Sequence, residues 1–162
     1  MAKARKKARA RSRSVSRKAT ARRPGQIKMQ AKRRPSQKFT VSHHRDEDFD
    51  YGLRPYSAYR DLGIAPATGG MVQAHVIRMT KPFDANEVAI PHYHDVDFQM
   101  VYVLKGSFTS EFEGQGVHTF HAGSCWIQPP RIKHTVRGYS DDCELLEIVL
   151  PASFATVTLA GG

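Results

Sequence analysis

Residues 91–106 read PHYHDVDFQMVYVLKG, and this stretch decides how the rest of the chain is interpreted. His92 and His94 are two positions apart, so in a β-strand both imidazoles leave the same face, about 7 Å apart at the backbone. Two neutral ring nitrogens placed in this way can bind one metal ion. Four residues separate His94 from Gln99, which suits a tight connection between antiparallel strands, and residues 100–104 are apolar and rich in valine. The pattern predicts a hairpin that stands Gln99 beside the two imidazoles.

A second segment, residues 123–134, reads GSCWIQPPRIKH and completes the candidate site. The chain is expected to turn at Gly123, and the strand after it must end at Pro129 and Pro130, because proline does not fit inside a central strand. A new strand is expected to begin at His134. The predicted metal ligands are therefore His92, His94, Gln99 and His134.

The sequence from residue 71 onward predicts a series of short strands separated by glycine and proline. Residues 71–78 alternate with period two. Such a series indicates an all-β sandwich or small barrel, in which alternate strand residues can converge on one interior point. Ahead of the strands, residues 56–64 are expected to form a short helix. The further strands are predicted at residues 89–94, 99–105, 107–113, 117–121, 124–128, 134–138 and 143–150.

The two segments resemble the paired motifs of the cupin superfamily. That pattern has His-x-His, then a glutamate after three or four intervening residues and a glycine after six more, and then a glycine, a proline and a third histidine after a variable spacer. The resemblance covers roughly residues 71–155 and implies a double-stranded β-helix, the jelly-roll-like cupin barrel, with a metal site inside and a homodimer as the assembly. The residues at the family's spacings are His92, His94, Gln99, Gly106, Gly123, Pro129 and His134.

Three residues depart from the family's pattern. Asn86 and Arg131 stand where it usually has glycine, and Gln99 stands where most members carry glutamate. Because Gln99 supplies no negative charge, a bound divalent ion keeps its full charge and favours an anionic ligand. Gln99 can also stay unbound, which leaves a three-histidine site. Arg131, at the turn before His134, is the candidate substrate-binding residue because it can pair with a carboxylate.

Nitrogen and oxygen ligands with open positions suit Fe(II), Mn(II), Ni(II), Co(II) or Zn(II), and residue identity does not choose among them. Fe(II) is favoured because the resemblance to cupin dioxygenases implies oxygen chemistry. The expected function is a metal-dependent, dioxygenase-like enzyme, or an isomerase or lyase, that acts on a small anionic or enolisable substrate. Two other classes stay open: a non-catalytic cupin that binds or senses a small molecule, and a protein that associates with nucleic acid through its basic tail.

Other histidines and acidic residues are weaker candidates for the metal site. His75, His118 and His121 match no motif position and are expected to be structural or exposed. A ligand histidine usually donates its second ring N–H to an acceptor such as a carboxylate. The candidates for this acceptor are Glu111, Glu113, Glu144 and Glu147, and the sequence does not choose among them.

The charge of the chain is divided between a basic N-terminal segment and an acidic remainder. The net charge is +10, yet residues 1–45 hold 17 of the 25 Lys and Arg and no Asp or Glu, which leaves 8 basic and 15 acidic residues, a net charge of −7, for residues 46–162. Residues 1–45 are expected to be disordered, because their charges repel and little in them is apolar. They can be a solvated extension, a non-specific binder of nucleic-acid phosphates, a transit peptide, or a leader that translation from Met29 omits.

The sequence predicts four segments: a disordered tail at 1–45, a linker with a short helix at 46–70, the barrel at 71–155 and a C-terminal tail at 156–162. A chain of 162 residues has room for one ordinary domain. No apolar run approaches the roughly 18 residues that a membrane span needs, and no apolar core follows the basic start as a secretory signal requires. The expected compartment is the cytoplasm, with no membrane partner.

Overall fold

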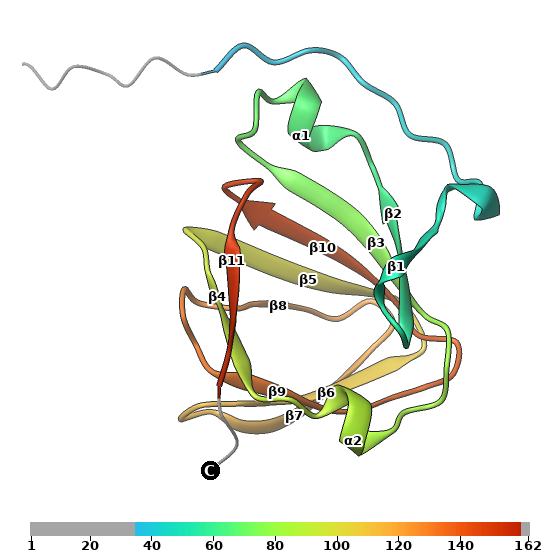
Figure 1. The fold of residues 1–162 in the computed structure, drawn as a ribbon, viewed down its shortest axis with the longest axis vertical. Coiled ribbons are helices and arrows are strands. Elements are labelled where there is room, and N and C mark those ends of the chain that lie inside the picture. Colours follow the sequence, from blue (N-terminus) through green and yellow to red (C-terminus); the bar gives the residue numbers. More distant parts are fainter. Residues whose placement is uncertain (1–34, 160–162) are drawn as a thin grey trace, which may run out of the picture. The chain divides into compact units, whose positions relative to one another are not determined.

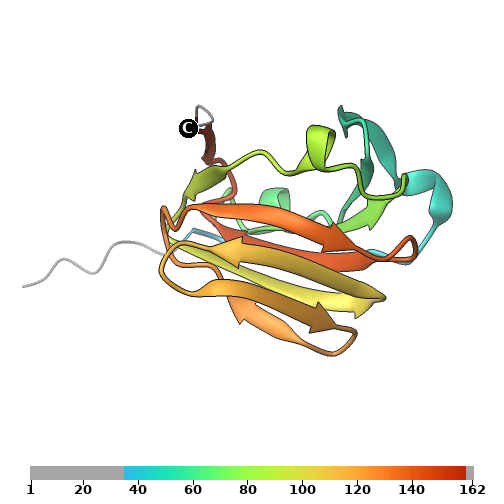
Figure 2. The ribbon, with the colours of Figure 1, turned by 90° about the horizontal axis from the view of Figure 1, so that it is seen from below.

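The computed structural model describes residues 35–159 as two antiparallel β-sheets that pack against each other (Figure 1, Figure 2). The all-β fold predicted from the sequence is confirmed. The disorder predicted for residues 1–45 falls, for residues 1–34, outside the described part of the chain. Residues 35–45 contain no helix or strand, but the Lys38 backbone N–H donates to the Ala67 carbonyl at 2.8 Å, so this stretch is joined to the sheets.

The larger sheet has six strands in the order β1-β2-β3-β10-β5-β8, and all neighbouring pairs are antiparallel. Strand β10 lies at its centre, hydrogen-bonded to β3 on one side and to β5 on the other. The strands span Asp50–Arg54 (β1), Ser57–Asp61 (β2), Gln73–Met79 (β3), Phe98–Lys105 (β5), Cys125–Ile127 (β8) and Glu144–Leu150 (β10).

The smaller sheet has five strands in the order β11-β4-β9-β6-β7, again with antiparallel neighbours. Its strands span His92–Asp95 (β4), Ser107–Phe112 (β6), Gly116–His121 (β7), His134–Tyr139 (β9) and Ala155–Thr158 (β11). The described residues also form three short helices: the 3-10 helix Asp46–Asp48, α1 Ile64–Ala67, which contacts β3, and α2 Ala85–Val88, which contacts β9. No helix in residues 35–159 is long and apolar enough to cross a membrane.

The core lies between the two sheets and is built from alternate residues of their strands. Positions along β5, β6 and β10 alternate between buried and half-buried, as the period-two geometry of a strand requires. Burying one valine, leucine, methionine or phenylalanine side chain stabilises a fold by about 1.5–3 kcal/mol. Buried apolar side chains between the sheets form a cluster, and this core cluster gives the site described below a rigid, apolar wall. Its buried members are Met79, Val101, Val103, Phe108, Cys143 and Leu145.

The strands predicted from residue 71 onward are confirmed, but the prediction for residues 56–64 is wrong. Ser57–Asp61 is strand β2, and the helix α1 begins only at Ile64. Local propensity is weak in this segment, and the backbone hydrogen bonds of β2 to β3 decide its conformation. At the other end, part of the expected C-terminal tail is strand β11, which pairs with β4. Both sheets therefore extend beyond residues 71–155.

The connection between β5 and β6 turns at Gly106, whose φ of 69° lies in the left-handed region. A Cβ at this position would collide with the side chains of Ser140 and Asp142 and would lie 3.1 Å from the Cα of Cys143. We expect Gly106→Ala to lower the free energy of unfolding by about 2–5 kcal/mol, because left-handed backbone costs a side chain about 1–2 kcal/mol and overpacking about 1–3 kcal/mol.

Urea denaturation measures this loss, and Gly114→Ala is the matched control. Gly114 also has a positive φ, 73°, but a Cβ there meets nothing within 4 Å. The control therefore carries only the backbone cost. Equal losses in the two variants would show that the close approach at Gly106 does not matter.

Candidate metal centre

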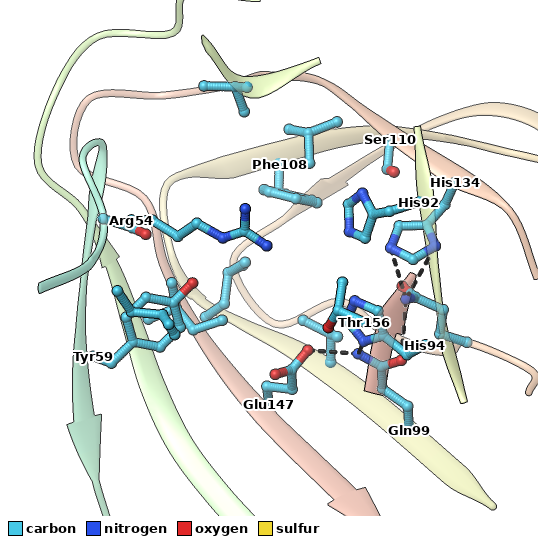
Figure 3. A pocket seen from close by; sticks show the side chains of 18 of the residues that line it. Arg54, Tyr59, His92, His94, Gln99, Phe108, Ser110, His134, Glu147 and Thr156 are labelled. Carbon is cyan, nitrogen blue, oxygen red and sulfur yellow. Dashed lines mark hydrogen bonds between the residues drawn. The ribbon is translucent and has the colours of Figure 1, made fainter. Parts of the chain in front are cut away.

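Three imidazoles converge where β4 meets β9 (Figure 3). Strand β4 presents His92 and His94 on one face, and His134 begins β9 directly opposite His92. One ring nitrogen from each histidine lies within 4.8 Å of the other two, and the ring centroids are 4.3, 5.2 and 5.3 Å apart. Nitrogens bound to one ion at about 2.1 Å lie roughly 3–4 Å apart, so small ring rotations bring these three onto an ion.

The backbone fixes the orientation of two of the three rings. His92 Nδ1 lies 2.7 Å from the Ile90 carbonyl oxygen, and His134 Nδ1 lies 3.0 Å from the Ile132 carbonyl oxygen. A carbonyl only accepts, so each Nδ1 carries the proton and each Nε2 keeps its lone pair. Gln128 Nε2 lies 3.0 Å from His134 Nε2 and 3.4 Å from His134 Nδ1, so this amide lies against the ring and not along the Nε2 lone pair. Metal-binding histidines are typically held in this way by an acceptor at the second nitrogen.

Burial keeps all three imidazoles uncharged near neutral pH. Loss of water around the rings lowers the pKa of His92 and of His94, and it lowers the pKa of His134 to about 4. The hydrogen bonds to backbone carbonyls oppose this shift at His92 and His134, and the positive charge of Arg54 adds to it at His92 and His94. Since a metal ion binds only the unprotonated ring, the donors are in the state that an ion requires.

Gln99 lies beside the imidazoles, as predicted, but its amide group is already engaged. Its side chain is 1% exposed, and its Nε2 donates to the Glu147 carboxylate at 2.6 Å and lies 2.9 Å from His94 Nδ1. Its Oε1 accepts from Gln128 Nε2 at 3.1 Å. Gln99 thus orients His94 in this structure, and it must turn its amide before its oxygen can bind an ion.

Glu147 is the buried carboxylate of the site. It lies on the central strand β10 and accepts hydrogen bonds from His75 Nε2 at 2.8 Å and from Gln99. Burial would raise its pKa, but the hydrogen bond and charge of His75, with His94 and Gln99, hold the pKa below its usual value. Glu147 therefore supplies a negative charge that is linked to His94 through the Gln99 amide. Among the four glutamates considered from the sequence, it is the one that the fold brings here.

The imidazoles open onto a cavity of about 190 Å³ between the two sheets. This is smaller than the roughly 300–1,000 Å³ of pockets that take drug-sized ligands, so the space suits a small molecule. Most of its wall is apolar, which keeps water away from a bound ligand. The apolar lining includes Ile77, Met79, Val101, Phe108, Trp126 and Leu145.

The structure does not bring Arg131 to this cavity. Its side chain is exposed and pairs with Asp95 through contacts of 2.8 and 3.2 Å, while its backbone N–H donates to the His94 carbonyl. With a φ of 62°, Arg131 occupies a left-handed turn, and its side chain does not line the cavity of the imidazoles. The arginine that does line the cavity is Arg54, which lies on strand β1 (Figure 3).

From the sequence, Arg54 was not identified as a site residue, and Glu147 was not distinguished from three other glutamates. The position of Glu147 in its strand did carry a signal. In β10, Glu147 is in phase with the buried Leu145 and Val149, so a charged residue occupies a core-facing position. Charged side chains are almost never fully buried without partners, and this phase marks Glu147 as part of an internal network. Arg54 carried no such signal, because every residue of β1 is exposed.

Comparisons with known proteins agree with this architecture. A cupin-domain family model matches residues 82–149, and no curated protein matches the chain in sequence. KdgF from Halomonas sp. is 21% identical with a TM-score of 0.54, over 70% of this chain and 94% of that one. The polyketide cyclase RemF from Streptomyces resistomycificus is 16% identical with a TM-score of 0.58, over 75% and 87%. Salicylate 1,2-dioxygenase from Pseudoaminobacter salicylatoxidans is 12% identical with a TM-score of 0.53, over 67% and 30%.

At these identities the likeness to solved structures concerns the fold alone. The residues matched by the family model include β4, β5 and β9, which together carry the three imidazoles and Gln99. The same strands hold the motif spacings that resembled the family in the sequence. Residues 82–149 therefore match the cupin-domain family, and the two sheets share the fold of these solved structures.

Proposed function

We propose that this protein is a metal-dependent enzyme that acts on a small anionic or enolisable substrate, with the ion held by His92, His94 and His134. The observation that carries the proposal is the convergence of three uncharged imidazoles inside a mostly apolar cavity. Gln99 is the candidate fourth ligand after its amide turns. Fe(II) is the favoured ion, with Mn(II), Ni(II), Co(II) and Zn(II) as alternatives, since the donor set suits each of them.

The proposed reaction class is dioxygenation. A bound iron ion would supply oxygen activation and Lewis acidity in this cavity. The chain's own residues hold and orient the ion, and the apolar wall excludes water from the substrate. One of the solved structures with this fold is a salicylate 1,2-dioxygenase, which supports the choice of reaction without fixing the substrate.

The charge of the cavity supports an anionic substrate. The sequence led to the expectation that no protein charge would offset the ion, whereas Glu147 contributes one negative charge next to Gln99. Arg54 lines the same cavity and contributes one positive charge. The two offset each other, so a divalent ion still leaves the cavity positive and favours a bound anion.

Metal content and oxygen consumption test the proposal directly. We expect the full chain, purified without chelators, to hold about one transition-metal ion per molecule by elemental analysis. Protein reconstituted with Fe(II) is expected to consume oxygen when small carboxylates or enolisable compounds are added, and protein loaded with Zn(II) is not. Failure to bind any divalent ion would overturn the proposal, and metal binding with no turnover of any such compound would favour a binding or sensing module.

A further inference from the structure

The hairpin of β1 and β2 places a guanidinium in the metal cavity. Arg54 is the last residue of β1, and its side chain extends into the cavity toward the imidazoles from the other end (Figure 3). Tyr59 of β2 lies at the same end of the cavity. The hairpin precedes residues 82–149, which match the cupin-domain family model. Arg54, Ser57 and Tyr59 therefore lie in a part of the chain outside that family match.

Arg54 has no partner among the residues that the structure describes. Three other arginines in this part of the chain, Arg78, Arg131 and Arg137, each pair with a carboxylate. The carboxylate that lines the cavity, Glu147, is held by His75 and Gln99. The guanidinium of Arg54 is therefore available to an anion that enters the cavity.

A second polar group at this end also lacks a partner. Ser57 lies opposite Arg54 in the register of the hairpin and lines the same cavity. The residue is 1% exposed, and within residues 35–159 its Oγ makes no hydrogen bond. Burying a hydroxyl without a partner is unfavourable, and an oxygen of a bound ligand would satisfy it.

We propose that Arg54 and Ser57 form an anion-binding end of the cavity, which selects substrates with a carboxylate remote from the group that reaches the metal. This inference rests on the proposed function and adds to it the class of substrate: a small organic acid with two anionic or metal-binding ends. The planar guanidinium binds a carboxylate through two parallel hydrogen bonds. The apolar wall between the two ends suits a short hydrocarbon linker, and the volume of about 190 Å³ limits its length.

Calorimetric titration of the full chain loaded with Zn(II) tests this inference without turnover. The probes are succinate, glutarate and adipate, each compared with the monocarboxylate of equal carbon number: butyrate, valerate and hexanoate. We expect one dicarboxylate to bind the wild type about 10–100-fold more tightly than its monocarboxylate, because a charge-assisted hydrogen-bonded pair is added at Arg54. Arg54→Gln is expected to remove most of this preference. Arg54→Lys is expected to retain part of it, since lysine keeps the charge but cannot form two parallel hydrogen bonds with a carboxylate.

Arg137→Gln is the matched control. Arg137 pairs with Glu111 on the surface and does not line the cavity, so this variant loses the same charge and is expected to keep the wild-type preference. Arg54 is exposed, so its replacement is expected to leave the melting temperature close to that of the wild type. An equal preference in the wild type and in Arg54→Gln, or no preference in the wild type, would overturn the inference.

Zinc content, measured on every sample, separates this inference from the proposed function. If the wild type takes up no zinc, the proposed function fails, and the same titrations are then made on the metal-free wild type and on Arg54→Gln. Weaker dicarboxylate binding by Arg54→Gln would still support the anion-binding end. Equal binding by the two proteins would overturn it.

Discussion

Replacing His134 with alanine is expected to lower the affinity for a divalent metal ion by well over 100-fold. Removing a residue that merely hydrogen-bonds a ligand costs metal sites roughly 10–100-fold, and His134 is proposed to bind the ion directly through Nε2. His134 is 7% exposed and lies opposite His92, and among residues 35–159 no fourth histidine lines the cavity beside these rings to replace it, since His75 is held by Glu147. Competition with a chromophoric chelator measures the affinity for Zn(II) or Co(II).

The control for this variant is His121→Ala. His121 is an exposed histidine at the end of β7, away from the cavity lining, and it accounts for any weak binding of metal to surface imidazoles. We expect His121→Ala to bind metal as the wild type does. Wild-type affinity in His134→Ala would remove the three-histidine centre and the proposed enzyme with it.

Replacing Glu147 with alanine is expected to lower the free energy of unfolding by about 3–5 kcal/mol, because it breaks a buried hydrogen-bonded charge network. The variant leaves His75 Nε2 and Gln99 Nε2 without their acceptor in the interior. Gln99 also loses the group that orients it toward His94, so metal affinity is expected to fall by roughly 10–100-fold. Urea denaturation of the metal-free protein and metal titration give the two effects separately.

Glu111→Ala is the matched control for this second variant. Glu111 is a glutamate on β6 that pairs with Arg137 in an exposed position, and such pairs contribute about 0–1 kcal/mol. It is expected to change neither stability nor metal affinity by much. A Glu147→Ala variant as stable as Glu111→Ala would mean that the buried network around Gln99 does not hold the site together.

Local patterns in the sequence were enough to predict the strands and the imidazoles. The two-residue spacing of His92 and His94 places both rings on one face whatever lies around them. Glycine and proline mark the ends of the strands between residues 71 and 150, and the strands confirm those signals. These features depend on residues that are close together in the sequence, so local patterns are enough to predict them.

Contacts between distant segments could not be predicted in the same way. Glu147 meets Gln99 across 48 positions and His75 across 72, and only the pairing of β10 with both β3 and β5 brings them together. Arg131 stands at a motif position, yet the left-handed turn it occupies directs it to Asp95. The homodimer and the nucleic-acid association of residues 1–45 stay predictions.

The β1–β2 hairpin also limited the prediction, because its composition indicates no single structure. Tyr51 and Leu53 are 63% and 70% exposed, and Gly52 interrupts the strand. Because β1 has no buried face, its sequence shows no period-two pattern. The backbone hydrogen bonds to β3 that hold β2, and through it β1, are made by residues more than ten positions away.

The two ends of the cavity come from different segments of the chain, so the ligand specificity can change without a change in the metal ligands. The donors for the ion come from β4 and β9, whereas the opposite end of the cavity comes from the β1–β2 hairpin early in the chain. Randomising the cavity-lining positions 53, 54, 56, 57 and 59 would change which ligands bind while the donor atoms keep their places. A library limited to these positions of the β1–β2 hairpin is therefore the preferred starting point for redesigning which ligands the cavity binds.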